Sequence, residues 1–134
     1  MLRWFVVALA LALTSATLNV IAPARSPEAG SHGFLVLAQI ILFSAAATYV
    51  ALAGGATWLS RVLLVGALGA GIGVMLEWWL LPAAVQRFAH DTVFIVLGPL
   101  SERLLIAVWL ATIAAAGSAV VGWLAVQIVS RAAA

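Results

Sequence analysis

A single carboxylate, Glu77, lies near the end of a long run of apolar residues. A charged side chain in such a run is costly unless it faces other helices, water or a partner, so it often marks the path of an ion or substrate. Glu77 is followed by Trp78 and Trp79 and precedes Pro82, a context that also suits a carboxylate among lipid headgroups. We expect a structural, interfacial acid, and a proton or substrate site is the alternative.

The two histidines and an aspartate are the next candidates for chemistry. Imidazole and carboxylate groups bind zinc, iron or copper, and His90 beside Asp91 could act as an acid-base pair on a lipid headgroup. However, no H-x-x-x-H spacing is present, and His32 is distant from His90 in the chain. We expect solvated histidines, with no metal site and no cofactor.

Two further ionic groups flank these residues. Arg87, and Glu102 with Arg103, could bind an anionic headgroup because a guanidinium binds phosphate in a bidentate manner. The simpler expectation is helix capping by Glu102 and headgroup contact by the arginines. The candidate residues of a ligand or ion path are therefore Glu77, Arg87, His90, Asp91, Glu102 and Arg103.

Nucleophilic catalysis has little support in this chain. There is no cysteine, which excludes disulfides, thiolate metal sites and cysteine nucleophiles. Ser101 could approach His90, but no nucleophile-elbow motif surrounds it. We expect the hydroxyls of the apolar runs to bond to their own helices, and we expect no catalytic activity; these hydroxyls belong to Ser15, Ser44, Thr48, Thr112 and Ser118.

Composition determines the fold class that must position these groups. Hydrophobic residues make up 66% of the 134 residues and charged residues only 7%, which is too apolar for a soluble domain of this length. A bilayer span needs about 20 mostly apolar residues, and the chain contains four such runs. The sequence predicts a single polytopic, all-α integral membrane domain over 1–134, a four-helix bundle with spans at 4–22, 34–53, 58–81 and 104–129.

Prolines and glycines set the expected boundaries of these spans. Residues 23–33 have loop composition, and Ala22-Pro23-Ala24 resembles a signal-peptide cleavage site, although we expect the first run to be an uncleaved anchor. Gly54-Gly55 ends the second run, and Pro82 is expected to end the third. A short interfacial helix is predicted over 83–97, and Ser101 is expected to cap the fourth span.

Small residues recur at a spacing of about one helical turn in the third and fourth runs. Such residues allow the backbones of neighbouring helices to approach closely. We expect the third span at the centre of the bundle, with the fourth packed against it through these positions: Gly66, Gly69, Gly71 and Gly73 with Ala111, Ala115, Ser118 and Gly122.

The charges predict the topology. With four spans, Arg3, Arg61 and Arg131 fall on one side, and the opposite side carries Arg25, Glu28, Glu77, Arg87, Asp91, Glu102 and Arg103. Under the positive-inside rule both termini are cytoplasmic. The absence of lysine and the abundance of alanine favour a bacterial source, so we expect a multi-pass protein of the bacterial inner membrane.

Three functions are compatible with this pattern. The favoured one is a non-catalytic accessory, anchoring or assembly subunit of a larger membrane complex, because ionic residues are confined to the edges of the spans. Its expected partners are the lipid bilayer with other membrane proteins or copies of itself; six isolated arginines do not form a nucleic-acid surface. The alternatives are a small-solute or ion transporter or channel with an outer polar vestibule, and an outer-face lipid-modifying enzyme.

Overall fold

The structure, a computed structural model, describes residues 1–25, 32–88 and 99–134. Four long helices account for nearly all of this part: α1 (Leu2–Arg25), α2 (His32–Ala53), α3 (Trp58–Phe88) and α4 (Leu100–Ala132). One 3₁₀ turn, η2 (Gly55–Thr57), connects α2 to α3. Each long helix is long and apolar enough to cross a membrane, so the prediction of an all-α chain with four such helices is confirmed.

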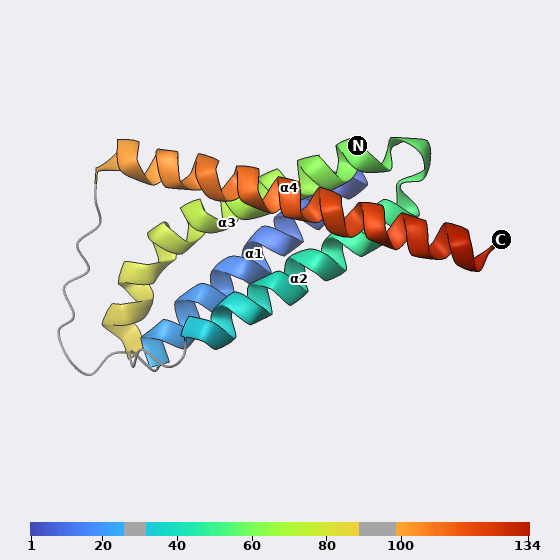
Figure 1. The fold of residues 1–134 in the computed structure, drawn as a ribbon. Coiled ribbons are helices and arrows are strands. Elements are labelled where there is room, and N and C mark those ends of the chain that lie inside the picture. Colours follow the sequence, from blue (N-terminus) through green and yellow to red (C-terminus); the bar gives the residue numbers. More distant parts are fainter. Residues whose placement is uncertain (26–31, 89–98) are drawn as a thin grey trace.

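Successive helices run antiparallel (Figure 1). Both chain termini and the α2–α3 connection therefore lie at one end of the bundle, which we name the closed end and which contains Trp4, Val50 and Val62. The opposite end contains Leu35 and Glu77 and is named the open end. The two most extensive helix–helix contacts are those of α3 with α1 and of α3 with α4.

The buried apolar core lies toward the closed end. Val50, Val62 and Val65 are its largest fully buried side chains, and Trp4 is only 5% exposed. Toward the open end the first half of α4 diverges from the end of α3 (Figure 1), and this leaves α4 the least buried of the four helices. The bundle is thus tightly packed at one end and splayed at the other; its core cluster is Trp4, Ala8, Leu11, Ala47, Val50, Ala51, Val62 and Val65.

The prediction that Pro82 ends the third helix is wrong, because α3 continues to Phe88. A proline removes one backbone N–H and bends a helix, but the loss of one hydrogen bond does not end a helix whose following residues, Ala83 and Ala84, favour helix. Residues 83–88 therefore belong to α3 and not to a separate helix over 83–97. The rest of that predicted helix lies outside the described residues.

Two other helix ends differ from expectation. The first helix includes Pro23 and ends at Arg25, so the predicted loop does not begin at Pro23. The fourth helix is capped by Pro99 and not by Ser101. The Pro99 carbonyl accepts hydrogen bonds from the backbone N–H groups of Glu102 and Arg103, at 3.1 and 3.3 Å, which satisfies two donors of the first turn without a side-chain cap.

Glycines bring α3 close to both of its neighbours. A Cβ at Gly66 would lie 2.9 Å from Ser118 Oγ and 3.2 Å from the Ala114 carbonyl oxygen and from Ala115 Cα. Gly71 faces Ala111 of α4, whereas Gly69 and Gly73 face α1, at Leu11 and Ala12. At the closed end, the side chains of Trp58, Ala51 and Val62 pack against Gly122 of α4.

The substitution Gly66→Ala is expected to lower stability by about 1 kcal/mol. Helix propensity gains roughly 0.5 to 1 kcal/mol, but forcing a methyl group against the α4 backbone costs about 1 to 3 kcal/mol. The control is Gly117→Ala, since a Cβ there meets nothing within 4 Å and should stabilise the protein slightly. Thermal unfolding of both variants in neutral detergent checks this; equal shifts would contradict close packing at Gly66.

Candidate functional site

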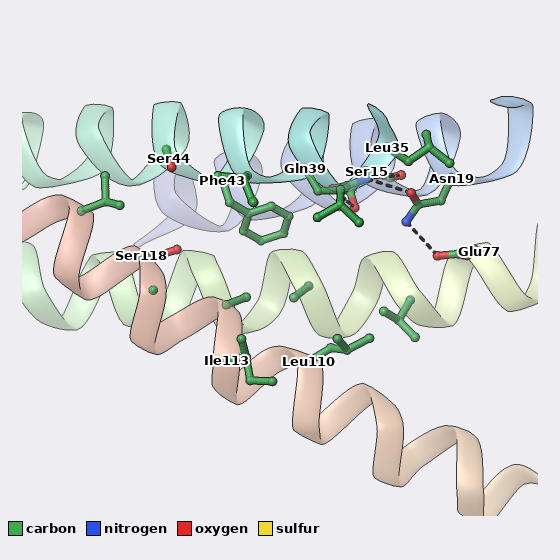
Figure 2. A pocket seen from close by; sticks show the side chains of 17 residues that line it. Ser15, Asn19, Leu35, Gln39, Phe43, Ser44, Glu77, Leu110, Ile113 and Ser118 are labelled. Atoms are coloured by element: carbon green, nitrogen blue, oxygen red, sulfur yellow. Dashed lines mark hydrogen bonds between the residues drawn. The ribbon is translucent and has the colours of Figure 1, made fainter. Parts of the chain in front are cut away.

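A chain of polar side chains connects α1, α2 and α3 inside the bundle (Figure 2). Ser15 Oγ donates a hydrogen bond to Gln39 Oε1 at 2.8 Å. Gln39 Nε2 donates to the Ser15 carbonyl oxygen at 3.2 Å and to Asn19 Oδ1 at 3.1 Å. Asn19 Nδ2 in turn donates to Glu77 Oε2 at 3.0 Å. We name these four residues the polar chain.

Helix geometry explains how the polar chain is assembled. Ser15 and Asn19 are four residues apart in α1, so they lie on the same face one turn apart. Gln39 of the antiparallel α2 contacts both of them. Its NH₂ group donates to the Ser15 carbonyl oxygen and to Asn19 Oδ1, and its side-chain oxygen accepts a hydrogen bond from the Ser15 hydroxyl. The three helices are therefore held in one rotational register by polar contacts.

The three hydrogen bonds between side chains point toward Glu77, whereas the bond from Gln39 to the Ser15 carbonyl oxygen points the other way. The Ser15 side chain donates to Gln39, Gln39 donates to Asn19, and Asn19 donates to Glu77. Aligned amide dipoles present their positive ends to the carboxylate, and hydrogen bonds in such a chain polarise one another. The hydrogen bond from Asn19 therefore offsets part of the cost of an ionised carboxylate among apolar side chains.

The polar chain borders a hollow of about 830 Å³ between α2, α3 and α4. Its walls are mainly apolar and include Leu35, Ile40 and Phe43 of α2 and Leu110 and Ile113 of α4. Hydroxyls of Ser44 and Ser118 also line it (Figure 2). The hollow is thus an apolar groove with a carboxylate and two amides along one side.

One oxygen of Glu77 has no hydrogen bond to another described residue. Oε2 accepts the hydrogen bond from Asn19, and no bond to Oε1 is found within the described residues. No buried side-chain oxygen or nitrogen in that part of the chain lacks a partner, so Oε1 is accessible. Glu77 itself lines the hollow.

The hollow does not extend through the closed end. Beyond Ser44 and Ser118 the space between the helices is filled by the core cluster, in which Val50, Val62 and Val65 are fully buried. Among the described residues, the hollow is therefore open toward the open end and toward the side where α2 and α4 diverge (Figure 1).

The structure does not bring all six predicted path residues together. Glu77 belongs to the polar chain, whereas Glu102 is exposed and Arg103 half-buried in the first turn of α4, which lies apart from the end of α3 (Figure 1). Arg87 is in the last turn of α3, and His90 and Asp91 lie outside the described residues. Within the described ranges no three His, Asp or Glu side chains are close enough to hold a metal ion.

Sequence reasoning missed three of the four residues of the polar chain. Ser15 was expected to bond to its own helix, as Thr112 does with the Val108 carbonyl at 2.8 Å, but its hydroxyl bonds to Gln39 instead. The available signal was that Asn19 and Gln39 are the only amides in the first two apolar runs, and amides in an apolar environment need hydrogen-bond partners.

A second polar cluster lies at the closed end. The guanidinium carbons of Arg3 and Arg61 lie 5.0 and 5.2 Å from the centroid of the Trp4 ring. Arg3 also donates a hydrogen bond to the Tyr49 hydroxyl. Trp4 is buried, with both guanidinium groups near its ring.

Comparison with known proteins gives this site no precedent to draw on: the chain matches no protein-family model, no curated protein and no solved structure.

Proposed function

We propose that the chain is a multi-pass membrane protein that binds a small amphipathic solute in the hollow, as the binding step of a transporter. The observation that carries the proposal is the polar chain, which ends on a carboxylate beside an apolar groove. Polar groups on membrane-embedded helices are costly and usually serve a ligand or ion path. A volume of about 830 Å³ is also in the usual range for small-molecule sites.

The lining indicates the class of solute. Leu35, Ile40 and Phe43 offer contact to an aliphatic or aromatic body. Glu77 Oε1 favours a head that donates hydrogen bonds, above all a protonated amine, because charge-assisted bonds are stronger than neutral ones. The divergence of α2 and α4 gives such a molecule lateral access from the bilayer. We therefore infer a cationic amphiphile and not an anionic one.

The proposed orientation follows from the arginines. Arg3 and Arg61 both lie near the Trp4 ring at the closed end, and Arg131 is in the last turn of α4 at the same end. By the positive-inside rule this end faces the cytoplasm. The hollow then opens toward the outer face of a bacterial inner membrane, and the core cluster at the closed end must part for a solute to cross.

A matched pair of ligands tests the binding step. Dodecylamine and dodecanoate have alkyl chains of similar length and opposite charge, and each is added below its micellar concentration to the protein in neutral detergent. Dodecylamine is expected to raise the unfolding temperature, since a ligand at 100 times its Kd stabilises by about 2.7 kcal/mol. Equal effects of the two ligands, or no effect of the amine, would count against the proposal.

A second candidate function is an accessory or anchoring subunit of a larger membrane complex. The observation that favours it is the last part of α4, which extends past the other helices at the closed end (Figure 1). The C-terminal half of α4 also exposes Trp123, Leu124 and Ile128, which could pack on a second membrane protein or on another copy of this chain. Affinity purification in mild detergent tests this candidate: a stoichiometric membrane partner would support it, and an isolated chain would not.

A further inference from the structure

Two arginines from different helices stack on one buried indole at the closed end. The centroid of the Trp4 ring is 5.0 Å from Arg3 Cζ and 5.2 Å from Arg61 Cζ. The two guanidinium carbons therefore cannot be farther apart than the sum of these distances. Cation–π contacts of this kind are attractive when the ring lies within about 6 Å of the cation.

Neutral acceptors hold both guanidinium groups in place. Arg61 Nη1 donates to the Gly54 carbonyl oxygen at 2.5 Å. Arg3 Nη2 donates to the Tyr49 hydroxyl, and Arg3 Cζ lies 5.5 Å from the centroid of the Tyr49 ring. The α2 helix and the α2–α3 turn thus fix the positions of cations that come from α1 and α3.

The cluster has two positive charges and no acidic side chain to balance them. Within the described residues, neither Arg3 nor Arg61 has a carboxylate partner, and the described acids Glu77 and Glu102 both lie at the open end. The two like charges, whose separation is at most the sum of the two ring distances, repel each other, and an anion beside them would relieve the repulsion. Stacking occupies the faces of the guanidinium groups and leaves most of their five in-plane N–H donors for such an anion.

From this geometry we propose that Arg3 and Arg61 form a binding site for a phosphate-bearing anion, with Trp4 as its platform. Phosphate matches the planar, bidentate fork of arginine. If the helices span a bilayer, the closed end lies at the level of the lipid headgroups, and the cytoplasmic leaflet is rich in anionic lipids. The shared chemistry is a phosphate group, supplied by an anionic phospholipid or by free phosphate. This site is independent of the hollow, which lies at the opposite end.

Native mass spectrometry of the intact protein in neutral detergent tests the site. The probes are cardiolipin, phosphatidylglycerol, phosphatidylcholine and inorganic phosphate. We expect the anionic lipids to bind at least tenfold more tightly than phosphatidylcholine, and Arg61→Gln to lower their affinity at least tenfold. The matched control is Arg131→Gln, which removes the same charge from an exposed position at the same end and should leave the affinity unchanged.

Each outcome bears on the proposal. Inorganic phosphate that competes with the lipid at millimolar concentration would identify free phosphate as the ligand, and a failure to compete would identify the lipid; both support the site if Arg61→Gln weakens it. Equal losses in Arg61→Gln and Arg131→Gln, or equal binding of all lipids, would overturn it. If Arg61→Gln does not fold, Arg3→Gln replaces it, because Arg3 is exposed and contributes less to packing.

Discussion

Glu77→Gln is expected to abolish most of the stabilisation by dodecylamine while the protein remains folded. A glutamine side-chain oxygen still accepts the hydrogen bond that Asn19 Nδ2 donates to Glu77 Oε2, so the polar chain is preserved. Only the negative charge toward the hollow is lost. Hydrogen bonds to charged groups contribute about 1.5 to 3 kcal/mol, which corresponds to a decrease in affinity of roughly tenfold to a hundredfold. Unfolding temperatures measured over a range of dodecylamine concentrations give the two affinities.

Glu102→Gln is the matched control for this experiment. It makes the same change of charge at an exposed position in the first turn of α4, also at the open end, but Glu102 does not line the hollow. The variant should bind dodecylamine as the unchanged protein does. An equal loss in both variants would show that the amine responds to the general charge of this end. Unchanged dodecylamine binding by Glu77→Gln would show that the Glu77 carboxylate does not bind the amine, and it would favour the accessory-subunit function.

The number and type of the helices could be predicted because length and hydropathy decide them. Four apolar runs of this length in a chain with 7% charged residues have few alternatives, since every backbone polar group must be paired in an apolar medium. The helix ends were less predictable. Pro23 and Pro82 both lie within helices, where apolar flanking residues outweigh the loss of one hydrogen bond.

The polar chain could be predicted only in part. The cost of a carboxylate in an apolar run singled out Glu77, but its partners depend on how α1 and α2 are rotated about their axes. Both helices are apolar on all sides, so hydrophobic periodicity does not indicate which face is buried. Only the contact itself reveals that Asn19 and Gln39 share a face with Glu77.

The closed end illustrates the same limit in another way. Tryptophan near the end of an apolar run usually marks the interface with the headgroups, and Trp58 and Trp123 are partly or largely accessible as that rule implies. Trp4 is instead buried in the core cluster, and Arg3 and Arg61 approach its ring from two helices. Arg3 and Arg61 are far apart in the sequence, so no local sequence pattern predicts the cluster.

Gln39→Leu is expected to lower stability by about 3 to 5 kcal/mol, the largest loss among the variants considered. Three hydrogen bonds of Gln39 disappear, and each is worth roughly 0.6 kcal/mol between membrane helices. The side chains of Ser15 and Asn19 then lose a partner inside the bundle, at a further cost of about 1 to 3 kcal/mol. Leucine is similar in size, so packing changes little. Unfolding in neutral detergent measures the loss.

The matched control is Gln127→Leu, the same replacement at a half-buried position of α4, outside the polar chain, and its effect should be below about 0.5 kcal/mol. Gln39→Leu should also weaken dodecylamine binding, because the leucine removes the amide dipole of Gln39 from the polar chain that leads to Glu77. Equal stability losses in the two variants would contradict the polar chain as a stabilising element. A loss of stability with unchanged amine binding would separate the two roles: Gln39 would then hold the helices in register, and Glu77 with Asn19 alone would form the binding contact.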